Sequence, residues 1–149
     1  MHIHIRFRTD ILLYLSVMKS FQKVHTILYV TDQAISREFY RQILGLEPVL
    51  DVPGMTEFQL SEVFTLGLMP HSSINKILQG KTEDPASGSG IPRCELYLYV
   101  YDSEAEYQNA VALNAKVLSA PADRDWGDRA FYLADPDGHI VAFAKQLKN

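Results

Sequence analysis

The stretch His25-Thr-Ile-Leu-Tyr-Val30, followed by Asp32, has a counterpart later in the chain: Glu95-Leu-Tyr-Leu-Tyr-Val100, followed by Asp102. A second pair follows, namely Phe39-Tyr-Arg-Gln-Ile-Leu-Gly-Leu-Glu-Pro-Val49 and Tyr107-Gln-Asn-Ala-Val-Ala-Leu-Asn-Ala-Lys-Val117. The offset is 70 residues in the first pair (25 to 95) and 68 in the second (39 to 107), so the copies differ by a two-residue deletion. A tandem repeat of this kind predicts two equivalent supersecondary units that bury their apolar faces together.

The first copy is predicted to have the order β-α-β-β-β. Residues 23–31 alternate like a half-buried strand, Asp32 is a candidate helix N-cap, and Gly45 stands where a C-cap glycine belongs. The apolar stripe of the helix between them consists of Ile35, Phe39 and Ile43. Three short strands are expected near residues 46–52, 55–61 and 63–69, with a turn at Pro53-Gly54.

The second copy is predicted to repeat this order after a linker, residues 71–92, that contains one short helical turn at 74–78. A capping box, Ser103-x-x-Glu106, introduces a helix that ends near Asn114. Strands are expected at residues 94–101, 116–119, 129–134 and 139–146, with a loop over 121–128. The turn Asp135-Pro-Asp-Gly138 joins the last two strands.

Length and composition indicate one ordinary globular domain. The chain has 149 residues, of which 47% are apolar and 21% charged, and its net charge of −4 argues against nucleic acid as a partner. Cys94 is the only cysteine, so no disulfide forms within the chain, which fits a reducing compartment and a cytoplasmic location.

Residues 1–20 are interpreted as an N-terminal extension, and residues 21–147 as the single domain. The apolar run at residues 11–15 is too short for a bilayer span and lacks the features of a signal peptide, so no membrane partner is expected. Alternation at residues 2–8 suits an extra edge strand. His2 and His4 are compatible with a metal pair, but a polar face of the extension is the favoured interpretation.

The two faces of the strand at residues 94–101 differ in chemistry. Cys94, Leu96, Leu98 and Val100 fall on one face, which is expected to pack on the helix. Glu95, Tyr97, Tyr99 and Tyr101 fall on the other face. A carboxylate beside three phenols is typical of a cavity lining, so we expect this face to line a cavity, as we expect of His25, Ile27 and Tyr29 in the first copy.

These residues resemble the vicinal oxygen chelate superfamily, which includes glyoxalase I, bleomycin-resistance proteins, fosfomycin-modifying enzymes and extradiol dioxygenases. The resemblance covers residues 21–147 and rests on three segments: the His25 strand with Asp32, Phe39-Tyr…Leu44-Gly-Leu46, and Asp135-Pro-Asp-Gly-His139. It implies an α+β fold of two tandem βαβββ modules whose curled mixed sheets line a cavity, and it implies a homodimer.

Enzymes of this superfamily hold one divalent metal ion, and the resemblance places the ligand positions at His25, Gly67, Glu95 and Ala142. Glycine and alanine have no side-chain donor, and two side chains completed by water would bind a metal ion weakly. The small residues are expected to leave room at the cavity floor for an apolar or aromatic ligand. No cofactor is therefore expected, with a divalent metal ion as the alternative.

The candidate ligand-binding residues are Tyr29, Thr65, Tyr97, Tyr99, Trp126 and Arg129. Trp126 is suited to stacking on a ligand and Arg129 to pairing with an anionic group, whereas the alternative is a loop anchored by Trp126 with Arg129 in a salt bridge. His25 and Glu95 are the candidate catalytic or metal-binding pair, and the alternative for them is a buried pair in which each satisfies the other.

Two functions remain open on these grounds. The first is a small-molecule-binding protein of the glyoxalase/bleomycin-resistance type with a degenerate metal site. The second is a metal-dependent lyase, isomerase or dioxygenase in which His25 and Glu95 hold the metal ion or move a proton. A non-catalytic subunit with a vestigial cavity is a third and weaker alternative.

Overall fold

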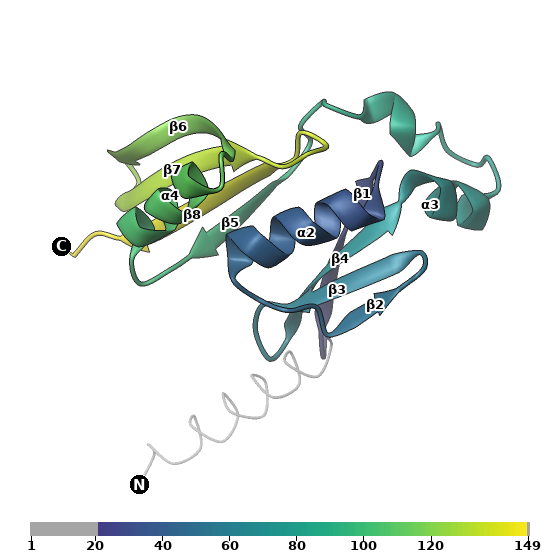
Figure 1. Ribbon diagram of the computed structural model, residues 1–149, viewed down its shortest axis with the longest axis horizontal. Coiled ribbons are helices and arrows are strands. Elements are labelled where there is room, and N and C mark those ends of the chain that lie inside the picture. The colour runs from purple at the N-terminus through teal and green to yellow at the C-terminus, as the bar shows by residue number, and fades with distance from the viewer. Residues whose placement is uncertain (1–20, 149) are drawn as a thin grey trace, which may run out of the picture.

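The computed structural model describes residues 21–148 and contains two βαβββ modules in succession (Figure 1). The first module consists of β1 (Val24–Val30), α2 (Gln33–Leu44), β2 (Leu50–Val52), β3 (Met55–Gln59) and β4 (Phe64–Pro70). The second consists of β5 (Glu95–Tyr99), α4 (Ser103–Ala112), β6 (Lys116–Asp123), β7 (Asp128–Ala134) and β8 (Ile140–Gln146). The interpretation of residues 1–20 as an extension, with its edge strand and histidine pair, lies outside the described residues.

Each module forms one four-stranded mixed sheet. The strand orders are β1-β4-β3-β2 and β5-β8-β7-β6, so the two sheets have the same topology. The first strand of each module pairs in parallel with the last, and the remaining neighbours are antiparallel. The prediction of an α+β fold built from tandem βαβββ units is confirmed.

The helix ends follow from local hydrogen bonding. The Asp32 side chain accepts from the Ile35 amide at 3.0 Å, and Gly45 ends α2 with a left-handed φ of 65°, as predicted. In α4 the N-cap is Asp102, which accepts from the Ala105 amide at 3.1 Å. The capping box predicted at Ser103 was therefore wrong by one residue, since Ser103 is already helical and buried.

The linker and one strand are more regular than the sequence indicated. The linker contains a full helix, α3 (His71–Leu78), and a short 3₁₀ helix at Pro85–Gly88. Strand β6 continues to Asp123, so the loop expected over residues 121–128 is reduced to a tight turn at 124–127. No helix among residues 21–148 is long and apolar enough to cross a bilayer.

The buried face of α2 differs from the predicted stripe. Ile35 is 57% exposed, whereas Ser36 and Tyr40 are fully buried together with Ile43. The reason is that α2 packs on its own sheet and also against the second module, so two of its sides are covered (Figure 1). Residues of both modules form one continuous apolar core, from Leu28 and Phe58 to Phe131 and Val141.

Two buried aspartates of the turn 135–138 hold the modules together. Asp135 accepts a hydrogen bond from Tyr40 Oη at 2.8 Å, and His139 Nδ1 lies 2.8 Å from the same carboxylate oxygen. Asp137 accepts from the Thr31 amide at 2.9 Å and from Ser36 Oγ at 3.3 Å. The turn that connects β7 to β8 is therefore also the polar part of the contact between modules.

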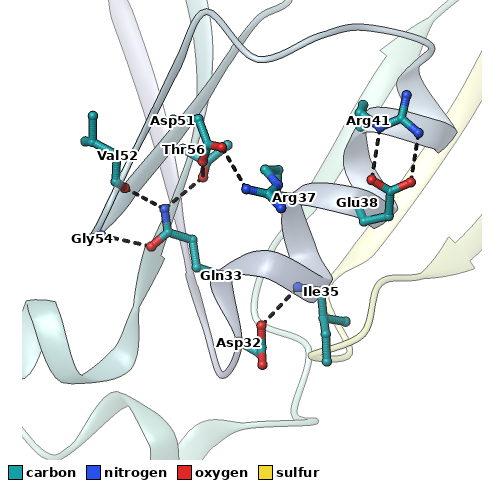
Figure 2. A network of polar contacts seen from close by, with 10 residues as sticks. All are labelled: Asp32, Gln33, Ile35, Arg37, Glu38, Arg41, Asp51, Val52, Gly54 and Thr56. Atoms are coloured by element: carbon teal, nitrogen blue, oxygen red, sulfur yellow. Dashed lines mark hydrogen bonds and ion pairs between the residues drawn. The ribbon is translucent and has the colours of Figure 1, made fainter.

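A second polar network fixes the β2–β3 hairpin to the start of α2 (Figure 2). Gln33 Nε2 donates to the Val52 carbonyl at 2.8 Å and to Thr56 Oγ1 at 2.9 Å, and Gln33 Oε1 accepts from the Gly54 amide at 2.9 Å. Arg37 donates to Asp51 at 2.7 Å. The Thr56 hydroxyl and the Arg37 guanidinium lower the pKa of Asp51. This network orients the edge of the first sheet.

Candidate functional site

The face of the second sheet that points away from α4 carries aromatic and acidic side chains. Glu95, Tyr97 and Tyr99 alternate with Leu96 and Leu98, which pack against the core, as predicted. Tyr132 and Asp128 of β7 lie on the same face, since Tyr97 and Tyr132 are both in register with Ala142 of β8. We refer to Tyr97, Tyr99, Trp126 and Tyr132 as the aromatic cluster.

A row of alanines forms the floor beneath the aromatic cluster. Ala130, Ala142 and Ala144 are fully buried. Strands β5 and β7 flank β8 and so lie about 10 Å apart, yet the rings of Tyr97 and Tyr132 have centroids only 6.4 Å apart. The two rings must therefore lean toward each other over Ala142. The space that a small residue was expected to leave open at this position is covered by the protein's own phenols.

Asp128 is the hydrogen-bond acceptor that joins the rings of the cluster. Its side chain accepts hydrogen bonds from Tyr97 Oη at 2.8 Å and Tyr99 Oη at 2.9 Å, and only 4% of the residue is exposed. Trp126 Nε1 in turn donates to Tyr97 Oη at 3.0 Å. Hydrogen bonds thus run in one direction, from the indole to the phenol to the carboxylate, and they fix the orientation of three rings.

The same contacts keep the phenols protonated. Burial raises the pKa of Tyr97 to about 12; the Trp126 hydrogen bond opposes this shift, and the Asp128 hydrogen bond and charge add to it. The hydrogen bond to Asp128 also raises the pKa of Tyr99. Both hydroxyls therefore act as donors at neutral pH, and neither is a base.

Arg124 lies at the β6 side of this face. Its guanidinium carbon is 5.1 Å from the centroid of the Tyr132 ring, and Nη2 donates to Ser119 Oγ at 2.8 Å and to the Ala130 carbonyl at 3.0 Å. Its Nε is buried and has no hydrogen-bond acceptor among residues 21–148. No carboxylate in this part of the chain forms an ion pair with it.

Arg129 lies on the other face of the second sheet from Arg124. It falls between Asp128 and Ala130 in β7, so its side chain lies on the helix side of the sheet, where it pairs with Glu104 and, at 2.9 Å, with Asp123. A salt bridge was the alternative interpretation of this residue, and the structure shows two. Arg129 therefore has no part in the site that we propose.

The first sheet presents a smaller polar pair on the face away from its helix. His25 Nδ1 lies 3.6 Å from Glu57 Oε1, and Glu57 is in register with Gly67. Thr65, in register with His25, is buried, and Tyr29 lies four residues after His25 on the same face of β1 and is half-exposed. A Cβ atom at Gly67 would lie 3.1 Å from Ile27 Cγ1 and 3.3 Å from Met55 Sδ, so glycine suits this crowded position.

The structure places the four positions implied by the resemblance on two different sheets. His25 and Gly67 belong to the first, and Glu95 and Ala142 to the second. Three pockets along residues 21–148, of about 540, 490 and 360 Å³, are lined by none of these four residues, and no hydrogen bond or ion pair between described residues joins His25 to Glu95.

The residues present do not fit the metal site of the superfamily. Gly67 and Ala142 offer no donor atom, and Ala142 is buried beneath two phenol rings. Within residues 21–148 no three His, Cys, Asp or Glu side chains are grouped closely enough to hold an ion. We therefore derive no chemistry that passes through a metal ion at these positions.

The remaining candidates lie apart from the aromatic cluster. Cys94 is exposed, which corrects the expectation that it packs on the helix, because β5 begins only at Glu95. His71, Tyr29, Cys94 and His139 line the 490 Å³ pocket between β1, α3 and the linker. A hydrogen bond with Asp135 raises the pKa of His139, and burial opposes this shift.

Sequence reasoning missed several residues of the site. Tyr132, Asp128 and Arg124 were not among the candidates, and neither was Glu57 on the first sheet. Alternation along β7 could have indicated Asp128 and Tyr132, since residues 128, 130 and 132 share a face. Arg124 and Glu57 carry no such signal, because their partners come from other strands.

Comparison with known proteins identifies the class. The paired βαβββ modules, each with the first and last strands side by side, are those of the vicinal oxygen chelate superfamily. Residues 23–148 match the family model described as "Glyoxalase-like domain", and the chain belongs to this family. A protein of Mycobacterium bovis described as uncharacterized is 30% identical over 124 residues, which span 81% of each chain.

Solved structures support the same fold. A glyoxalase/bleomycin resistance protein/dioxygenase from Nocardioides superposes with a TM-score of 0.71 at 21% identity, and the match covers 95% of both chains. A glyoxalase-related enzyme from Fulvimarina pelagi gives a TM-score of 0.70 at 23% identity, covering 85% of this chain and 89% of that one. At these identities the likeness establishes the fold.

Proposed function

We propose that the protein is a small-molecule-binding member of the glyoxalase-like family whose ancestral metal site is degenerate. The observation that carries this proposal is the replacement of a donor at position 142 by a buried alanine under the rings of Tyr97 and Tyr132. Aromatic rings with polar tips, held rigidly on an open sheet face, are suited to contact a planar ligand. The family relationship to bleomycin-resistance proteins agrees with a binding role.

A thermal-shift screen against aromatic and thiol-conjugated compounds tests the proposal. A ligand that binds only the folded protein stabilises it by about 2.7 kcal/mol at 100 times its dissociation constant, so we expect a related set of compounds to raise the melting temperature. An exposed-site control, Tyr101→Ala, should leave the shifts unchanged, because Tyr101 is 99% exposed. A panel that produces no shift contradicts the proposal.

Metal analysis separates this function from the enzymatic alternative. The His25–Glu57 contact of 3.6 Å is the feature that favours the alternative, because it places a nitrogen and a carboxylate together on the first sheet. After incubation with Ni²⁺, Mn²⁺, Fe²⁺ or Zn²⁺ we expect no tightly held stoichiometric ion. An ion retained by the protein and lost in His25→Ala would support a metal-dependent lyase, isomerase or dioxygenase instead.

We further propose that the protein acts as a homodimer in which a second copy encloses the open sheet faces and leaves room for the ligand between them. Ile27 and Tyr29 of the first sheet, Tyr99 of the second sheet and Trp126 of the adjoining turn are between 36% and 60% exposed, and they form an apolar surface that a second copy could contact. Sedimentation equilibrium should give twice the chain mass of 16.9 kDa. A monomer at micromolar concentration would contradict this assignment. A cytoplasmic location remains a prediction.

A further inference from the structure

Arg124 is a cation that lacks a charge partner within the described residues. Its Nη2 donates only to neutral oxygens, those of Ser119 and Ala130, and its buried Nε donates to nothing among residues 21–148. By contrast, Arg129 pairs with two carboxylates. A charged donor that is buried without an acceptor is costly and calls for an explanation.

The guanidinium and the aromatic cluster form one continuous surface. Arg124 lies over the ring of Tyr132, whose ring in turn neighbours that of Tyr97 at 6.4 Å. Within the same cluster, Tyr99 is 60% and Trp126 57% exposed, so a planar molecule has rings to contact. A positive charge therefore lies at one end of an aromatic surface that is already rigid.

Asp128, which shares this face with the acidic Glu95, is directed away from Arg124. Asp128 and Arg124 are neighbours through their backbones, since the Arg124 amide donates to the Asp128 carbonyl at 2.7 Å. Their side chains diverge, because Asp128 binds the hydroxyls of Tyr97 and Tyr99 on β5, whereas Arg124 binds Ser119 on β6. The Asp128 carboxylate is occupied in orienting rings, and the charge of Arg124 has no carboxylate partner among residues 21–148.

We propose that Arg124 and the aromatic cluster together bind a small aromatic carboxylate. This inference rests on the proposed binding function and names the ligand class for the same site. A guanidinium binds a carboxylate through charge-assisted hydrogen bonds, which are about twice as strong as those between neutral groups. The ring of the ligand then contacts Tyr132, Tyr97 and Trp126 at the geometry that aromatic pairs favour.

Trp126 provides a built-in readout, because it is the only tryptophan in the chain. We would titrate the full-length protein with benzoate, benzyl alcohol and benzylammonium, three probes that share one ring and differ in charge, and follow tryptophan fluorescence. We expect a saturable change with benzoate, about tenfold weaker binding of benzyl alcohol, and still weaker binding of benzylammonium. Equal affinities for benzoate and benzyl alcohol would overturn the inference.

Variants of Arg124 assign the effect to this residue. Arg124→Gln should weaken benzoate binding about tenfold and leave benzyl alcohol unchanged, and Arg124→Lys should retain part of the preference for benzoate. The matched control is Lys145→Gln, which removes a positive charge from an exposed position on the other face of the same sheet and should have no effect. Benzoate binding that survives Arg124→Gln in a folded protein would overturn the inference.

Two further outcomes separate this inference from the function on which it rests. Benzylammonium binding more tightly than benzoate would identify a cation site and overturn the inference, yet leave a small-molecule-binding protein. If none of the three probes changes the fluorescence while the thermal-shift screen finds other ligands, the ligand class is wrong and the binding function stands. If neither experiment finds a ligand, both are wrong.

Discussion

Asp135→Ala is expected to destabilise the folded protein by about 3–5 kcal/mol, because the substitution leaves several buried donors without an acceptor. The Asp135 side chain is fully buried and accepts from Tyr40 Oη, from the amides of Asp137 and His139, and lies 2.8 Å from His139 Nδ1. Tyr40 is itself completely buried, so water cannot replace the lost partner. Urea unfolding followed by linear extrapolation measures the loss.

The matched control is Asp125→Ala, the same substitution at an exposed aspartate in the turn before β7, which should change stability by less than about 0.5 kcal/mol. Tyr40→Phe removes one hydrogen bond and should cost about 1–2 kcal/mol. In the double variant the two costs should not add, because both substitutions break the same contact. If the losses of Asp135→Ala and Tyr40→Phe add fully, or if Asp135→Ala costs less than about 1 kcal/mol, then Asp135 does not hold the two modules together as proposed.

The contact of Asp135 and Asp137 with α2 shows which features could not be predicted from the sequence. The repeat predicts two βαβββ units, and local patterns correctly predict the Asp32 cap, the Gly45 terminus and the turn beginning at Asp135. The covering of α2 by the second module was not predictable, because the contact joins residues about 100 positions apart. Apolar periodicity therefore selected Ile35, whereas the structure buries Ser36 and Tyr40, whose polar atoms have partners in the second module.

In the candidate site, too, the sequence predicted the local features and missed those that depend on distant residues. Strand alternation places Glu95, Tyr97 and Tyr99 on one face, which is a local property of the chain. Alternation does not show that the buried Asp128 carboxylate accepts hydrogen bonds from two of these side chains, or that two phenol rings cover Ala142. Both features depend on the registers of β7 and β8. Ala142 therefore suggested open space from the sequence, and the fold fills that space with phenols.

This difference leads to the second prediction, Ala142→Glu, which places a carboxylate donor at one of the two ligand positions that lack one. A glutamate at this position would introduce a carboxylate and two methylenes between the rings of Tyr97 and Tyr132, where alanine is already fully buried. Overpacking and a buried charge both disfavour the folded state, so we expect a loss of about 3 kcal/mol or more and no gain in metal binding. Urea unfolding and metal analysis measure the two quantities.

Gly67→Glu is the matched control, because it fills the other ligand position that lacks a donor. Its Cβ would press on Ile27 and Met55, two side chains that are partly exposed, and its carboxylate would lie opposite Glu57, so the loss should be about 1–2 kcal/mol and smaller than that of Ala142→Glu. Tyr132→Ala should also relieve part of the cost of Ala142→Glu, because it removes one of the two covering rings. Two results would contradict this account: Ala142→Glu is as stable as the parent protein, or it binds a metal ion while Tyr132 is still present. Either result would mean that the rings of Tyr97 and Tyr132 do not fill the space over position 142.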